Sequence, residues 1–157
     1  MNLNVEMRMA GKRTGVKSSF PLLTTKILPP RIPPESIERP RLFALLPQVR
    51  AKQLTVIKAP AGFGETSLAV AWAERLRGMD SRVAWVGLDR DDDVPTRLLY
   101  YAAHALRRAC DGLGSSVIDM IAEISLLPIE TAISTLINEL AELDEDNRVS
   151  CCSRSHA

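Results

Sequence analysis

Two short apolar runs in the middle of the chain have the pattern of buried β-strands. Residues 53–59 (QLTVIKA) and 82–88 (RVAWVGL) are rich in β-branched side chains and stand next to turn-forming residues. Each run is followed by a stretch with helical periodicity. Because strands that alternate with helices are typical of parallel sheets, the pattern predicts an α/β fold.

The helical stretches repeat apolar residues every three or four positions. Residues 66–78 place Leu68, Trp72 and Leu76 on one face and end at Gly78. A second helix is expected over 96–111, a shorter one begins near Ser116, and a last one opens at Pro128. In the second and last helices we expect inward-facing side chains at Leu98, Ala102, Ala105, Leu106, Ala109, Ile129, Ile133, Leu136, Ile137, Leu140 and Leu143.

The first fifty residues differ in composition from the rest. Residues 1–20 are basic and polar, without the apolar core of a signal peptide, and we expect a disordered tail there. Residues 21–40 contain five prolines after the opening one, which predicts an extended arm lying on another part of the molecule. A short helix is expected in the segment RLFALLPQV (41–49).

Composition narrows the class of protein only a little. The chain has 157 residues, enough for one domain, with 20 Lys and Arg against 19 Asp and Glu. The balanced charge therefore favours no particular partner. Because no run reaches about 18 apolar residues, we expect a soluble cytoplasmic protein without a membrane span. The three cysteines lack metal-ligand spacing, and we interpret them as incidental thiols.

The segment APAGFGET (59–66) nearly matches the phosphate-binding pattern G-x-x-x-x-G-K-[ST]. In that pattern glycines let backbone N–H groups surround phosphate oxygens, and the next helix directs its positive end at them. Gly62 and Gly64 can supply the curved backbone, and Thr66 stands where a hydroxyl would hold Mg²⁺. Ala59 replaces the first glycine, a mild change. The alternative is a plain strand-to-helix turn.

Glu65 stands where the pattern requires lysine, so a negative charge replaces a positive one. At about 4 Å one charge pair is worth roughly 4 kcal/mol at an effective dielectric constant near 20, and reversal changes the balance by up to about twice that. Two alternatives would restore a positive charge beside the phosphates, and both are less favoured. In one, Lys58, which just precedes the loop, replaces the missing lysine; in the other, Mg²⁺ bridges Glu65 and phosphate.

From about Leu22 to Leu143 the chain resembles the N-terminal part of the MalT-like, LuxR-type ATP-dependent transcriptional regulators, which belong to the STAND class of P-loop NTPases. LLTTKILPPRIPPESIERPRLFALL is similar to the family's arm and its Arg-Pro-Arg-Leu signature. LTVIKAPAGFGETSLAVAW is similar to the strand, Walker A loop and helix, and VAWVGLDRDDDVPTRLLYYAAHAL to the next strand, acidic turn and helix. Val94 stands where the family usually has aspartate.

The resemblance implies ATP or ADP with Mg²⁺ as the ligand, with the arm near the nucleotide base. The alternative for Arg39 and Arg41 is a solvated cap on the following helix. The acidic turn at 89–93 is interpreted as solvated and without a chemical role. The metal-binding candidate is Thr66, and the nucleotide-binding candidates are Arg39, Arg41, Ala59, Pro60, Ala61, Gly62, Phe63, Gly64, Glu65, Thr66 and Ser67.

The family pattern next requires an apolar strand ending in paired aspartates, the Walker B element. The chain instead ends in SCCSRSHA, which shows no strand pattern and no acid. We therefore expect an incomplete P-loop NTPase-type parallel sheet with flanking helices, marginal in stability. The expected divisions are a disordered tail (1–20), an arm with a short helix (21–50), a partial nucleotide-binding domain (51–147) and an aberrant tail (148–157).

These observations lead to three functional hypotheses. The first is a truncated nucleotide-binding module of a MalT-like regulator, with weak or no ATP binding and no enzymatic activity. The second is a non-enzymatic interaction fragment that self-associates or pairs with full-length regulators through its arm or open sheet edges. The third, a working small P-loop kinase, is least favoured because the lysine and the second acidic motif are missing. No DNA-binding element is visible.

Overall fold

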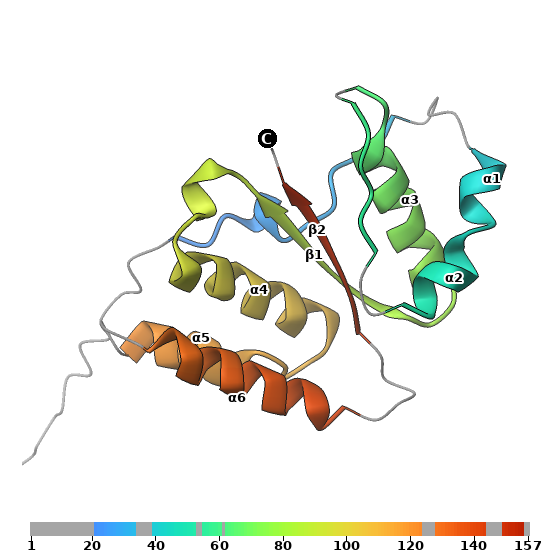
Figure 1. The fold of residues 1–157 in the computed structure, drawn as a ribbon. Helices are drawn as coiled ribbons and strands as arrows, with labels where there is room; N and C mark the ends of the chain where they lie inside the picture. Colours follow the sequence, from blue (N-terminus) through green and yellow to red (C-terminus); the bar gives the residue numbers. More distant parts are fainter. Residues whose placement is uncertain are drawn as a thin grey trace, which may run out of the picture.

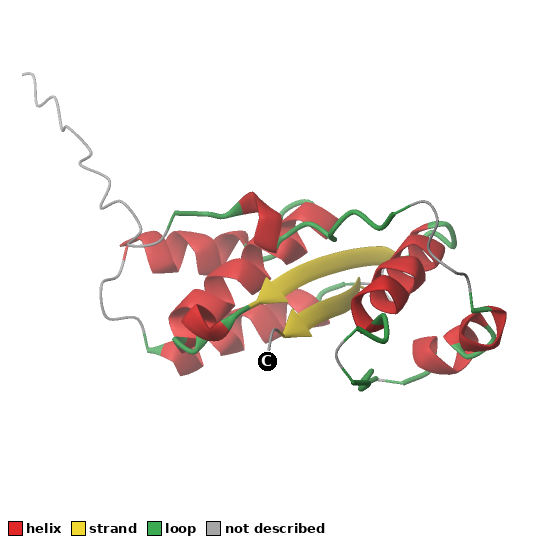
Figure 2. Ribbon diagram, turned by 90° about the horizontal axis from the view of Figure 1, so that it is seen from above, coloured by secondary structure: helices red, strands yellow, loops and turns green. Residues whose placement is uncertain are grey.

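A computed structural model describes residues 21–33, 39–52, 55–60, 62–123, 128–143 and 149–155. Two parallel strands form its sheet, with α3 on one face and α4 on the other, and α5 and α6 form a further layer beyond α4 (Figures 1 and 2). In chain order the elements are η1 (Thr24–Lys26), α1 (Pro40–Phe43), α2 (Leu46–Arg50), α3 (Glu65–Arg77), β1 (Arg82–Leu88), η2 (Arg90–Asp92), α4 (Pro95–Ala109), α5 (Ser115–Glu123), α6 (Ile129–Ala141) and β2 (Val149–Ser155).

Strand β1 lies at the centre because both of its faces are covered. Successive side chains of a strand point to opposite faces, and four consecutive residues from Val83 to Val86 are buried. Val83 packs with the α3 side chains Trp72 and Leu76, whereas Ala84 and Val86 belong to the larger core built around α4. The predicted strand at 82–88 is therefore confirmed, as is the buried face of the helix before it.

Strand β2 corrects the expectation that the C-terminal segment forms no strand. Residues Val149–Ser155 pair in parallel with β1, in a register that sets Arg82 opposite Val149 and Leu88 opposite Ser155. Strand pairing joins backbone N–H and C=O groups, so a segment with few apolar side chains can complete it. The side-chain pattern of SCCSRS therefore did not reveal the strand.

The strand predicted at 53–59 is wrong for the residues that the structure describes. Residues 55–60 belong to neither a helix nor a strand, and the side chain of Val56 is 75% exposed. Gln53 and Leu54 lie outside the described residues. The described sheet contains β1 and β2, so the segment before the glycine loop approaches it without ladder pairing.

The last helix is present where it was predicted, but part of its predicted inner face is wrong. Ala132 and Leu136 are buried against the core, while Ile133, Ile137 and Leu140 are 44%, 57% and 37% exposed. Helix α6 packs on α5 and α4 along one narrow stripe. Ile133 and Ile137 each follow one of these buried residues by a single position, and one residue turns an α-helix by about 100°, so their side chains point away from that contact. Leu98 of α4, also predicted to face inward, is 40% exposed.

The first part of the proline-rich arm, residues 21–33, contacts β1 and α4, and residues 34–38 lie outside the described residues. Ile27 is buried in the larger core, and the Tyr101 hydroxyl lies 3.5 Å from the carbonyl oxygen of Pro21. A Cβ on Gly87 would lie 3.6 Å from the Lys26 carbonyl oxygen, so the arm runs close to the end of β1. The short helix expected at 41–49 is divided into α1 and α2, with Pro47 in the first turn of α2.

An ion cluster fastens the arm to the acidic turn, which corrects the expectation that residues 89–93 are merely solvated. Lys26 Nζ lies 2.7 Å from Asp92 Oδ2 and 2.9 Å from Asp89 Oδ2, and the Asp92 side chain is only 2% exposed. Burial acts to lower the pKa of Lys26, but hydrogen bonds to both carboxylates outweigh it and raise the pKa above its ordinary value. The Lys26 hydrogen bond lowers the pKa of Asp89.

The structure is thus α/β with a parallel strand pair and flanking helices, as the sequence predicted at that level. Two strands do not by themselves define a P-loop NTPase sheet. The expected tail at 1–20 lies outside the described residues. No helix in the described ranges combines the length and apolarity needed to cross a bilayer.

Candidate functional site

The glycine loop has the backbone conformation that its sequence predicts. Gly62 and Gly64 both have φ of +84°, in the left-handed region that other residues rarely occupy. The Phe63 N–H donates to the Pro60 carbonyl oxygen at 3.1 Å, which closes a tight turn. A Cβ on Gly62 would meet nothing within 4 Å, so backbone conformation and not crowding calls for glycine there. Ala61 lies outside the described residues.

Helix α3 begins directly after this turn. Gly64 is its N-cap residue, and the Leu68 N–H donates to the Gly64 carbonyl oxygen at 2.9 Å. The first turn of a helix leaves backbone N–H groups without intrahelical partners, and these groups attract anions. Thr66 and Ser67 lie half-buried in this first turn. The loop and helix together form a short backbone cradle for an anion, open beside the 59%-exposed Phe63.

Glu65 directs its carboxylate back to the loop entrance. Its Oε1 accepts a hydrogen bond from the Ala59 backbone N–H, and the residue is half-buried. A carboxylate in the first turn is favoured by the helix dipole, so Glu65 stabilises the loop locally. The same negative charge opposes a phosphate group in the cradle. The backbone thus suits an anion, but the side chain at this position does not.

Nucleotide with Mg²⁺ therefore fits the loop only in part. The left-handed glycines give a backbone conformation that suits phosphate, and Thr66 lies in the first turn of α3. Lys58, the nearest cation in sequence, is exposed and precedes the turn outside any strand. Among the described residues no group of three or more His, Cys, Asp or Glu side chains is arranged to hold a metal ion. No chemical step is therefore assigned to a bound nucleotide or metal.

Arg39 and Arg41 show no interaction with the glycine loop among the described residues. Arg39 is the N-cap residue of α1 and Arg41 lies within that helix, and both are exposed. In the described parts of the chain neither makes a hydrogen bond or an ion pair with a loop residue. Their nucleotide-base role stays a prediction, and their position at the start of α1 agrees with the alternative of a solvated helix cap.

The chain is similar to two kinds of known protein. It is 29% identical, over 88% of its own length, to the serine/threonine-protein kinase PknK of Mycobacterium tuberculosis (strain ATCC 25618 / H37Rv), of which it covers 12%. It is 29% identical over 78% of its length to the HTH-type transcriptional regulator MalT of Yersinia enterocolitica, covering 13% of that protein. The MalT of Serratia proteamaculans is 33% identical over 58% of this chain, which covers 10% of it.

These similarities support a relationship to the MalT-like regulators. The chain spans only 10% to 13% of the length of these curated relatives. What the relatives do as whole proteins therefore reaches this chain only as a proposal. No family model matches the chain, and no solved structure matches it.

Proposed function

We propose that this chain is an N-terminal nucleotide-binding module of a MalT-like, LuxR-type regulator with a degenerate Walker A loop. It binds ATP or ADP weakly or not at all, and it does not hydrolyse ATP. The relationship to MalT proteins and the left-handed Gly62 and Gly64 support the module. The observation that carries the proposed weakness is Glu65, whose carboxylate is held by the loop's own Ala59 N–H.

The electrostatic argument follows from the position of that carboxylate. A phosphate at the start of α3 meets favourable backbone N–H groups but also a half-buried negative charge. One like-charge pair at about 4 Å costs roughly 4 kcal/mol at an effective dielectric constant near 20, before screening. That is comparable with the whole binding free energy of a millimolar ligand, which is about 4 kcal/mol.

The absence of hydrolysis in this proposal rests on β2. The related pattern places a strand ending in paired aspartates after residue 147, and β2 is the strand found there. Its sequence, VSCCSRS, contains no acidic residue. It therefore offers no carboxylate to position Mg²⁺ or an attacking water.

The test compares three chains: the natural protein, Glu65→Lys and Glu65→Gln. Fluorescently labelled ATP is titrated with Mg²⁺, and the dissociation constants are compared at fixed ionic strength. We expect little binding by the natural chain, stronger binding by Glu65→Gln and the strongest by Glu65→Lys. The glutamine removes the repulsion between Glu65 and phosphate, and the lysine adds an attraction. Micromolar binding by the natural chain, with no gain in either variant, would refute the electrostatic argument.

A second candidate is a non-enzymatic fragment that pairs with full-length relatives. The observation that favours it is the two-stranded sheet, in which each described strand has an edge without a strand partner. Open edges can accept a further strand from another chain. Co-purification of the tagged chain with a full-length paralogue tests this candidate. If the paralogue is present at its normal cellular concentration and the tagged chain is nevertheless recovered alone, this candidate is contradicted.

A further inference from the structure

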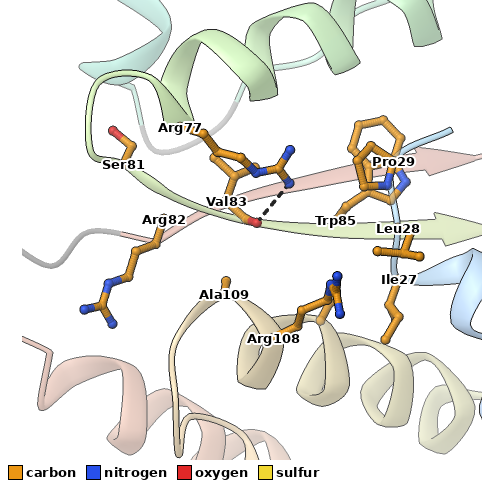
Figure 3. A pocket seen from close by; sticks show the side chains of 11 residues that line it. Ile27, Leu28, Pro29, Arg77, Ser81, Arg82, Val83, Trp85, Arg108 and Ala109 are labelled. Atoms are coloured by element: carbon orange, nitrogen blue, oxygen red, sulfur yellow. Dashed lines mark hydrogen bonds between the residues drawn. The ribbon is translucent and has the colours of Figure 1, made fainter. Parts of the chain in front are cut away.

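A cavity that no residue of the glycine loop lines lies beside β1 and has a volume of about 630 Å³ (Figure 3). Its walls come from the arm, from the end of α3 with the following turn, and from α4. Among the described residues that line it, three are arginines, Arg77, Arg82 and Arg108, and none is an aspartate or a glutamate. In a chain with a formal net charge of +1, this is a local concentration of positive charge.

None of the three guanidinium groups pairs with a carboxylate among the described residues. Arg77 Nη2 donates to the Val83 carbonyl oxygen at 3.4 Å, and Arg82 Nη1 donates to the Cys110 thiol at 2.6 Å. Arg108 makes no hydrogen bond or ion pair within the described ranges. Their mutual repulsion is therefore not offset by a carboxylate of the described chain.

Two of these arginines approach the cavity from opposite faces of the sheet. Figure 3 shows the Arg77 guanidinium near Val83 on the α3 side of β1, and the Arg108 guanidinium on the α4 side. The Arg82 guanidinium points away from these two and donates to Cys110, and Trp85 with Pro29 forms an apolar wall. An anion in the cavity would therefore have guanidinium donors on both the α3 side and the α4 side of β1.

We propose that this cavity binds a small phosphorylated anion. Guanidinium groups bind phosphate through paired, charge-assisted hydrogen bonds, and arginine is favoured wherever phosphate is recognised. The volume lies within the range of small-molecule sites, roughly 300–1,000 Å³. The site is distinct from the loop, because Arg77 ends α3 and Glu65 begins it, about 18 Å apart along a helix of this length.

Inorganic pyrophosphate is the probe, titrated by isothermal calorimetry into the full chain without Mg²⁺ at moderate ionic strength. The variants are Arg77→Gln and Arg108→Gln, and the matched control is Arg107→Gln. Arg107 neighbours Arg108 on α4 and is exposed, but it does not line the cavity, so its loss changes the net charge equally. Circular dichroism establishes that every variant retains the fold.

We expect the natural chain and Arg107→Gln to bind pyrophosphate within about two- to threefold of each other. Each cavity variant should bind at least about tenfold more weakly, the loss typical for a hydrogen bond to a charged group. No binding by the natural chain, or an equal loss in Arg107→Gln, would overturn the proposal. A parallel titration with ATP separates the two sites, since binding at the cavity depends on Arg108 and binding at the loop depends on Glu65.

Discussion

Replacing Gly114 with alanine tests the packing of the helical layer directly. Gly114 precedes α5 and has φ of +80°, and a Cβ there would lie 2.6 Å from the carbonyl oxygen and 3.0 Å from the Cα of Ala103 in α4. Both neighbours are backbone atoms of a buried helix, so they cannot rotate away. The glycine is thus needed for its conformation and for the close approach of its backbone to α4.

The chain supplies a matched control two residues earlier. Gly112 has φ of +85°, but a Cβ on it would meet nothing within 4 Å. Alanine in the left-handed region costs about 1–2 kcal/mol, and the reduced freedom of the unfolded chain returns about 0.4–1 kcal/mol of this. Gly112→Ala should therefore reduce the free energy of unfolding by only about 1 kcal/mol.

Gly114→Ala carries the same conformational cost and adds the collision with Ala103. Overpacking of a well-packed site typically costs about 1–3 kcal/mol. The sum is about 2–4 kcal/mol, a large share of the roughly 5–15 kcal/mol by which native domains are stable.

The assay is equilibrium urea unfolding of the natural chain and both variants, followed by far-ultraviolet circular dichroism. The midpoint concentrations give the stability difference if the slopes agree. We expect a clearly lower midpoint for Gly114→Ala than for Gly112→Ala. Equal midpoints for the two variants would refute the reasoning, because conformation alone would then account for both losses.

Three further predictions concern charge and exposure. Lys26→Met should lower the free energy of unfolding by about 1.5–3 kcal/mol, because the buried Asp92 carboxylate loses a charged hydrogen-bond partner but retains its ion pair with Arg97, whose Nε lies 3.4 Å away. Asp93→Asn at an exposed position should change the free energy of unfolding in urea by less than about 0.5 kcal/mol. Burial, with the nearby Arg107 charge, lowers the pKa of His104 in the folded chain. The free energy of unfolding should therefore fall as the pH drops below about 6.5, where the histidine of the unfolded chain takes up a proton. His104→Phe should flatten this part of the plot of stability against pH, and an unchanged plot would contradict this cause. Ile137→Ser should leave the urea midpoint nearly unchanged, because the side chain is 57% exposed, and a loss above about 1 kcal/mol would show that this face of α6 is covered in solution.

Local periodicity predicted the elements whose buried face follows from their own pattern of apolar side chains. The β-branched run at 82–88 and the four-residue spacing of Leu68, Trp72 and Leu76 both correspond to buried faces. Gly62 and Gly64, from which a curved backbone was expected, both have left-handed φ values. In these segments the signal is local, so one sequence window is sufficient.

The features that the sequence did not reveal depend on distant partners. Asp92 belongs to a run of acids that normally faces solvent, and it is buried because Lys26, 66 residues earlier, reaches it. Residues 149–155 form a strand because the backbone edge of β1 is available to pair with them. Conversely, residues 55–60 have a strand-like composition but no ladder partner in the described sheet. The cavity arginines are also far apart in sequence, and only the fold brings Arg77 and Arg108 together.

The parallel register of β1 and β2 has a consequence for synthesis of the chain. Arg82 pairs with Val149, so β1 and the helices after it leave the ribosome well before its partner strand exists. During that interval β1 exposes backbone donors and acceptors that other nascent chains can capture. Contacts between such distant residues also form slowly. Chaperone dependence during translation should therefore be greatest in the period before residue 149 emerges.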